Sequence, residues 1–226
     1  MCLRSWIAAA ATLLVAGAAL AQNPDAPKTT AKEGELLPAV PFPSFNVNGA
    51  KAKRLVCLFV ERDQNPTVAV IAFKAPEKPS EPLAGLLQKL ETRATEQKAT
   101  YFGAFAIFLT MEKPLSDDPT GGTQFGAVEG LISQLKLKEV TVGLETKDVP
   151  QAAAFGIDKD KDEVTVLVYT RLKVERRFTF TKDKPMTDKD VDDIVAAAEK
   201  IIPMKKKKYK RRLAAWRGTP SRKRRA

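Results

Sequence analysis

Short apolar runs alternate with amphipathic segments along the middle of the sequence. The run YFGAFAIFLT at residues 101–110 is almost continuously apolar, which is typical of a strand covered by helices on both faces. Leucines precede it at helical spacing, with charged and polar residues between them: Leu83, Leu86, Leu87 and Leu90. Because strands joined by helices return in the same direction, this alternation predicts an α/β fold with a parallel core.

Further elements flank this central unit. Residues 54–60 and 67–73 are apolar, β-branched runs separated by the turn sequence DQNP, and we expect them to pair as strands. Residues 125–135 have apolar side chains at helical spacing, and residues 139–144 follow as another strand. The helices therefore separate three strands of one sheet.

The last third of the chain has a different pattern of secondary-structure elements. A short helical stretch at residues 152–155 leads to strands at 164–169 and 173–180, with a turn at Arg171-Leu172, which predicts a β-hairpin. Thr187 is then placed to cap a final amphipathic helix, with acidic residues in its first turn, and Pro203 ends that helix.

The N-terminus has the features of an export signal. Arg4 precedes an apolar run at residues 6–20, and Ala19-Leu20-Ala21 supplies the small-x-small pattern that a signal peptidase accepts. The run is shorter than the roughly twenty apolar residues of a permanent transmembrane helix, and no later segment of the sequence is a better candidate. We therefore expect a signal peptide at residues 1–21 and a periplasmic or secreted chain without a membrane span. An uncleaved anchor is the alternative.

Composition divides the remaining chain into three parts. Residues 22–43 are rich in Pro, Ala, Thr, Lys and Glu without hydrophobic periodicity, which is typical of a linker. Residues 44–203 contain the predicted elements and are long enough for one domain. Residues 204–226 form a tail that supplies the whole excess of positive charge. The domain itself is therefore close to neutral.

Two residue types exclude whole classes of site. The sequence has no histidine, which removes Ser-His-Asp and Cys-His nucleophilic sites and His-containing zinc sites. It has two cysteines, and removal of the signal leaves only Cys57. The mature chain therefore has no intrachain disulfide, and its stability must come from a hydrophobic core.

The order of these elements resembles that of the thioredoxin-like superfamily. The segment PSFNVNG at residues 43–49 is similar to the opening of the peroxiredoxin-like members, and FGI at residues 155–157 is similar to a tripeptide before the thioredoxin hairpin. The resemblance covers residues 43–202. It implies a three-layer α/β sandwich: a central mixed sheet, a C-terminal β-hairpin and final helix, and an added N-terminal hairpin. Another three-layer α/β sandwich is the alternative.

The same resemblance implies that the redox site of the superfamily has been lost. Thioredoxins carry two cysteines at the start of the helix after the first central strand, where the helix dipole activates a thiol. Matching residues 73–75 (FKA) to the end of that strand places Lys78 and Glu81 at the cysteine positions. The superfamily also has a cis-proline before the hairpin, and this chain has Asp162-Glu163-Val164 there.

The sequence contains two other candidate sites. Cys57 lies within the apolar run RLVCLFV, which favours a buried structural thiol over a reactive one. Asp158, Asp160 and Asp162 repeat the first ligand positions of a calcium loop. The required glycine and the final glutamate are replaced by Glu163 and Tyr169. We expect a solvated acidic turn rather than a metal site, and no cofactor.

The tail has the strongest binding signal in the sequence. Its basic residues are interleaved with Tyr209 and Trp216, a pattern that suits phosphates, anionic lipids or other polyanions. Export favours anionic lipid over nucleic acid as the ligand. The alternative is a tail that binds no ligand and only increases solubility. The candidate anion-binding residues are Lys205, Lys206, Lys207, Lys208, Lys210, Arg211, Arg212, Arg217, Arg222, Lys223, Arg224 and Arg225.

These observations favour a non-enzymatic, exported thioredoxin-like module. We expect it to bind an unknown protein partner through the surface at residues 78–82, while the tail adds electrostatic adhesion. The alternative is an enzyme that handles thiols or peroxides with Cys57 as a lone reactive residue, which requires an exposed thiol with a lowered pKa.

Overall fold

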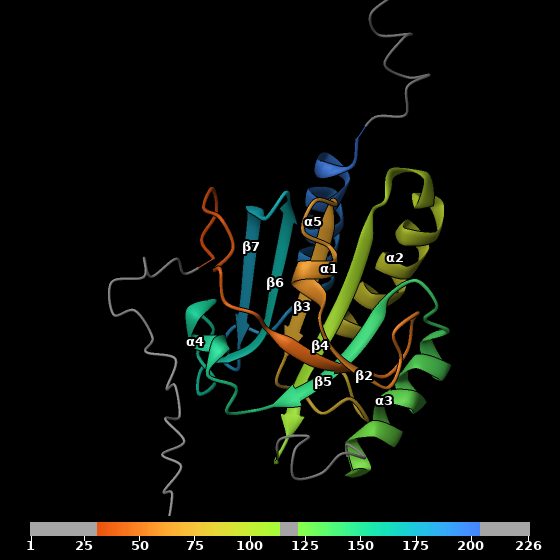
Figure 1. The fold of residues 1–226 in the computed structure, drawn as a ribbon, viewed down its shortest axis with the longest axis vertical. Helices are drawn as coiled ribbons and strands as arrows, with labels where there is room; N and C mark the ends of the chain where they lie inside the picture. The colour runs from red at the N-terminus through yellow and green to blue at the C-terminus, as the bar shows by residue number, and fades with distance from the viewer. Residues whose placement is uncertain (1–30, 114–121, 204–226) are drawn as a thin grey trace, which may run out of the picture.

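The computed structural model describes residues 31–113 and 122–203. Within these ranges, seven strands form one mixed sheet in the order β2-β1-β5-β4-β3-β6-β7 (Figure 1). The strands are β1 Pro43–Asn46, β2 Arg54–Cys57, β3 Thr67–Ala72, β4 Gly103–Met111, β5 Thr141–Thr146, β6 Asp162–Thr170 and β7 Lys173–Thr181. The helices are α1 Leu58–Glu61, α2 Glu81–Glu96, α3 Gly122–Leu135, α4 Gln151–Ala154 and α5 Asp188–Ile201, with a 3₁₀ turn at Lys98–Thr100.

The predicted parallel core is confirmed. Strands β3, β4 and β5 are parallel neighbours, and β6 and β7 add the predicted antiparallel hairpin beside β3. Every residue of β3 and β4 is buried, in agreement with strands covered on both faces. The hairpin turn uses Arg171 and Leu172 with φ angles of 51° and 61°, as a tight two-residue turn requires.

One predicted strand pairing is wrong. Residues 54–60 do not pair with β3, because β2 pairs with β1 to form an N-terminal hairpin at the edge of the sheet. Only residues 54–57 are extended, and α1 follows. A helical turn lets the consecutive residues Leu58 and Phe59 both reach the core, whereas a strand would point them to opposite faces.

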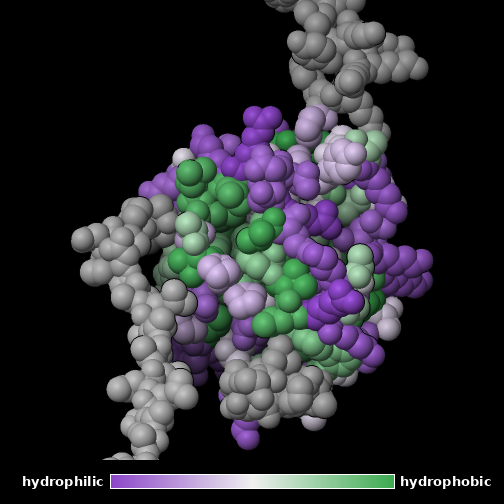
Figure 2. Space-filling view, in the orientation of Figure 1, coloured by the Kyte–Doolittle hydropathy of each residue, from purple (hydrophilic) through white to green (hydrophobic). Residues whose placement is uncertain are grey.

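Side chains on the two faces of the sheet form two separate cores. In β3, Val68 and Val70 face the core under α2, α3 and α5, while Ala69 and Ile71 face the core under α1, α4 and the N-terminal segment. This alternation follows the two-residue period of a strand. Figure 2 shows hydrophobic residues also exposed on the face that carries α1 and the N-terminal segment, where Leu36 and Val60 are 60% and 63% exposed.

The segment at residues 31–43 is packed against the sheet, although its composition suggested a linker. Leu37 and Phe42 are buried in the core beneath α1 and α4. The backbone of the segment also bonds to β7: the Gly34 N–H donates to the Val174 carbonyl at 2.8 Å, and the Val174 N–H donates to the Glu35 carbonyl at 2.9 Å. The apolar residues of this segment are interrupted by Pro38 and Pro41 and give no helical or strand period. The burial of Leu37 and Phe42 shows that the folded region begins before residue 44.

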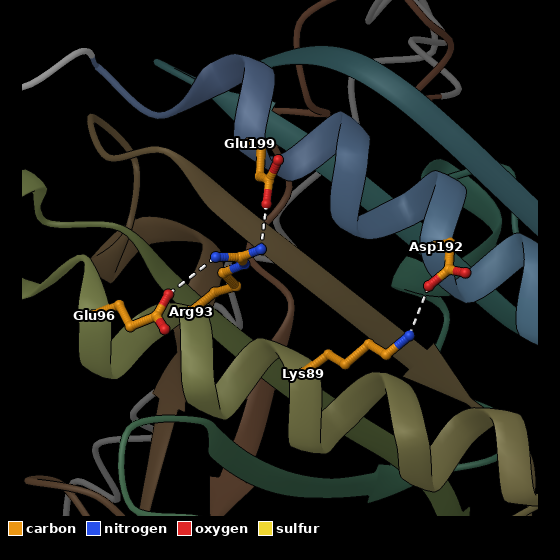
Figure 3. Close-up of polar contacts among 5 residues, drawn as sticks. All are labelled: Lys89, Arg93, Glu96, Asp192 and Glu199. Atoms are coloured by element: carbon orange, nitrogen blue, oxygen red, sulfur yellow. Dashed lines mark hydrogen bonds and ion pairs between the residues drawn. The ribbon is translucent and has the colours of Figure 1, made fainter. Parts of the chain in front are cut away.

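The helices α2 and α5 are linked by ion pairs on the surface of their layer (Figure 3). Lys89 pairs with Asp192 at 2.6 Å, and Arg93 pairs with Glu199 at 2.5 Å as well as with Glu96 on its own helix. At the N-terminus of α5, Thr187 forms the predicted cap as part of a capping box. No helix within residues 31–113 and 122–203 is long and apolar enough to span a membrane.

Candidate functional site

The carboxyl ends of the parallel strands β3, β4 and β5 lie together on one side of the sheet, which we call the carboxyl edge (Figure 1). In open α/β sheets, ligands characteristically bind outside this carboxyl edge, because loops rather than packed elements follow the strands there. The loop after β3 leads through residues 73–80 to α2, and the loop after β5 leads to α4. The predicted site residues Lys78 and Glu81 belong to the first of these loops and to the start of α2.

A cleft of about 370 Å³ lies at this edge. It is bounded by the residues that follow β3 and β5, by the loop before β6 and the first residues of β6, and by a residue after β7. The lining contains charged residues of both signs and one aromatic residue. The lining residues are Phe73, Lys74, Lys147, Asp148, Lys159, Asp160, Lys161, Asp162, Glu163 and Lys182.

Ion pairs join the walls of this cleft. Lys74, two residues after β3, pairs with Glu163 at 2.7 Å; the Lys74 side chain is half-buried, and that of Glu163 is more shielded from solvent. On the opposite wall Lys159 pairs with Asp148. The hydrogen bond and charge of Lys159 lower the pKa of Asp148, and the same contact raises the pKa of Lys159. The mixed charges therefore suit a polar partner surface better than a simple anion.

The acidic loop uses its carboxylates to hold its own backbone. The Asp160 N–H donates to Asp158 Oδ1 at 3.0 Å, and the Asp158 N–H donates to Asp162 Oδ2 at 3.0 Å. Lys161 also pairs with Asp158 at 3.1 Å. The backbone bond from Asp160 is the main cause of the lowered pKa of Asp158. Among the described residues no group of three Cys, Asp or Glu side chains is arranged to hold a metal ion.

Lys78 and Glu81 lie beside this edge but do not line the cleft. Lys78 is exposed in the loop before α2, and Glu81 is the exposed first residue of α2. Ser80 is the cap residue and Pro82 follows in the first turn, a position where proline is well tolerated. The described residues contain no cis peptide bond, and Glu163 continues the antiparallel pairing by accepting the Phe73 N–H at 2.9 Å.

Cys57 lies elsewhere, at the end of β2. Its side chain is half-buried and packs against the core beneath α1 and α4. The Phe42 N–H donates to its Sγ at 3.3 Å. The structure therefore places the thiol partly within the core, on a strand that is separated from β3 in the sheet order by β1, β5 and β4.

Arg177 connects β7 to the residues that follow α4. From β7, its guanidinium donates to the Phe155 carbonyl at 2.6 Å and to the Gly156 carbonyl at 2.8 Å. The backbone N–H of Arg177 donates to Glu33 Oε1 at 3.0 Å. Burial lowers the pKa of Arg177, and the charge of Asp162 opposes this effect. The FGI tripeptide is therefore tied both to the hairpin and, through Arg177, to the N-terminal segment.

Most residues of the cleft are not among the candidate site residues predicted from the sequence. Lys74 and Lys147 are each close to the end of a buried strand, and this position was the available signal. Lys182 follows the last strand of the hairpin and had no comparable signal. The basic tail, residues 204–226, lies outside the described residues, so its proposed anion-binding role remains a prediction.

Glu145, near the end of β5, predicts a measurable pH dependence. Burial raises its pKa, although its Oε1 accepts the Thr146 N–H at 2.7 Å. Because the folded state holds the proton more tightly, the stabilisation from Glu145 is complete below its unfolded pKa and is lost as pH rises through its folded pKa. We expect Glu145→Gln to raise the melting temperature at neutral pH, and this gain to disappear below about pH 4. Thermal unfolding across this range tests it; a pH-independent difference would contradict it.

Solved structures with a similar fold are known. No protein-family model matches the sequence, and no curated protein gives a significant match. Two solved structures are similar: peroxidoxin BcpB from Mycobacterium tuberculosis, with 15% identity and a TM-score of 0.50 over 75% of this chain and 97% of that chain, and reduced Prx3 from Vibrio vulnificus in complex with hydrogen peroxide, with 13% identity and a TM-score of 0.51 over 74% and 98%.

A secreted disulfide oxidoreductase from Mycobacterium tuberculosis, homologous to DsbE of E. coli, also matches, with 16% identity and a TM-score of 0.42 over 70% of this chain and 96% of that chain. At these identities the first two matches establish the fold and not the activity. Together with the strand order and the helices on both faces of the sheet, they identify this chain as a protein of the thioredoxin-like fold.

Proposed function

We propose that this protein is an exported, redox-inactive thioredoxin-like module that binds a protein partner at the carboxyl edge of its sheet. The observation that carries the proposal is the chemistry at the start of α2. Exposed Lys78 and Glu81 stand there, beside a cleft lined by ion-paired lysines and acids. These groups offer hydrogen bonds and charge to a partner and have no means of exchanging a disulfide.

The absence of a thiol pair has a direct chemical consequence. Disulfide exchange needs one thiolate to attack a disulfide and a second to resolve the mixed disulfide. Once the signal is removed, the sequence retains Cys57 alone. A binding role at the same edge uses only features that the fold already supplies, namely a fixed helix start and loops held by Lys74–Glu163 and by Arg177.

The first experiment tests the loss of redox activity. The mature protein should not accelerate the reduction of insulin by dithiothreitol, because it cannot form and resolve a mixed disulfide within one chain. The precipitation of the insulin B chain, followed by turbidity, measures the rate against an ordinary thioredoxin. Turnover comparable to that thioredoxin would disprove the proposal.

The second experiment tests the binding surface. A photo-crosslinking residue in place of Lys78 should form a covalent adduct with a protein of the envelope fraction. The same residue in place of Lys200, which is exposed on α5, serves as the control for contacts made elsewhere. An adduct formed equally from both positions, or from Lys200 alone, would exclude the surface at the start of α2.

The second candidate is an enzyme that uses Cys57. The observation in its favour is the backbone N–H of Phe42 directed at Sγ, since such a bond would also stabilise a thiolate. Against it stands the packing of this side chain on apolar residues of the core, where a thiol behaves as a small hydrophobe.

Cys57→Val separates these two candidates. If the thiol is structural, the variant should stay folded, with a change in unfolding free energy of about 1 kcal/mol, and should keep the Lys78 crosslink. Chemical denaturation and the crosslinking assay provide the measurements. A folded variant that loses an activity found in the wild-type protein would favour the enzyme.

A further inference from the structure

The two edges of the sheet are protected unequally. At the β7 edge, the N-terminal segment covers the strand through a bridge between Leu36 and Lys173 and through backbone bonds to Leu172 and Val174. At the other edge, β2 pairs with β1 on its inner side, and no strand of the described chain pairs with its outer side. An uncovered edge strand presents unpaired backbone donors and acceptors to any extended chain nearby.

The side chains beside this edge are unusually apolar for an exposed strand. Leu55 in β2 is 58% exposed. It is the cross-strand partner of Phe45 in β1, whose ring lies 5.9 Å from that of Phe125 in α3. Cross-strand partners point to the same face of a sheet, so Leu55, Phe45 and the half-buried Phe125 form one apolar strip along the outer edge.

The beginning of β2 is positively charged. Lys53 and Arg54 are both exposed, and within the described residues neither makes an ion pair. Lys51, by contrast, is paired with Glu61. Two uncompensated cations at one end of an apolar strip repel basic segments and attract acidic ones.

We propose that the outer edge of β2 is a second docking surface, which accepts an extended segment of a partner protein as an additional strand. The segment has apolar side chains at alternate positions, which cover Leu55 and the Phe45–Phe125 pair, and acidic residues that face Lys53 and Arg54. Backbone bonds to β2 supply affinity and the alternate side chains supply selectivity. This surface lies on the opposite side of β5 and β4 from the β3 loop, so it is distinct from the proposed site there.

The test uses labelled synthetic peptides and the full mature chain. The probe is a peptide of about ten residues with alternating Val and Thr and a pair of glutamates at its carboxyl end, which antiparallel pairing would place beside Arg54. One control peptide has lysines in place of the glutamates. Another is N-methylated on alternate amides, which keeps the charge and so accounts for any binding to the basic tail. Fluorescence anisotropy measures affinity, and amide NMR shifts locate binding.

Binding of the acidic peptide should shift the amides of β2 and should weaken by about tenfold or more on N-methylation or in Leu55→Asp. Arg54→Glu should reverse the preference in favour of the lysine peptide, an outcome that a folding defect would not produce. Lys173→Glu, on the covered β7 edge, should bind as the wild type does.

Equal binding of the N-methylated peptide, or an unchanged preference in Arg54→Glu, would overturn the proposal, as would no binding of the acidic peptide. It would also fail if sedimentation without peptide showed a dimer that Leu55→Asp dissociates, because a second copy of the chain would then occupy this edge.

Discussion

Replacing Arg177 with methionine is expected to lower the unfolding free energy by about 2 kcal/mol. Methionine keeps the length and apolar volume of the side chain but removes the donors to the Phe155 and Gly156 carbonyls. Phe155 and Gly156 directly follow α4 and precede the acidic loop that lines the cleft. For a domain of this size, the melting temperature should fall by about 6 °C, as measured by thermal unfolding at neutral pH.

Arg176→Met is the matched control for that substitution. Arg176 neighbours Arg177 on β7, but its side chain is 55% exposed and contacts only Glu33 and the ring of Phe178 in the described structure. An exposed ion pair contributes little, so this variant should lose less than about 1 kcal/mol. Equal losses in both variants would mean that Arg177 stabilises β7 by charge alone, and that its bonds to the Phe155 and Gly156 carbonyls contribute nothing.

The order of elements could be predicted because each carries its own local pattern. The leucines of α2 repeat at helical spacing, and β4 is one almost continuous apolar run. The capping box of α5 is formed by Thr187 and Asp190, which are only three residues apart in the sequence. The short helix α1, which directly follows β2, could not be predicted from a local pattern. RLVCLFV has no period that distinguishes four strand residues from a helical turn, and tertiary burial of Leu58 and Phe59 decides the outcome.

The candidate site was less predictable than the fold for a related reason. The positions of Lys78 and Glu81 could be inferred from a single strand-to-helix junction, which is local in the sequence. The cleft joins Lys74, in the loop after β3, to Glu163 at the start of β6, and Asp148, after β5, to Lys159 in the loop before β6. No local pattern records which loops meet at an edge, because strand order and register decide it. The same limit explains why the packing of residues 31–43 on β7 was not expected.

Deleting residues 205–226 is expected to leave the domain folded and to abolish most of its adhesion to polyanions. The final helix α5 ends at Ile201, and its buried residues all precede Pro203, so the core should not depend on the tail. The twelve basic residues of the tail should bind anions by releasing counterions. If about six of them contact phosphates, affinity for single-stranded DNA should fall roughly 300-fold as salt rises from about 50 to 200 mM.

Retention of the full-length and truncated proteins on anionic vesicles, heparin and single-stranded DNA, measured at several salt concentrations, tests this prediction. A steep salt dependence that disappears on truncation would assign the adhesion to the tail, since the domain itself carries nearly balanced charge. Stronger retention on vesicles than on DNA at equal salt would favour a lipid surface as the ligand, with Tyr209 and Trp216 at the interface. A melting temperature that collapses on truncation would instead show that the tail belongs to the fold, and unchanged retention would leave the tail without an electrostatic role.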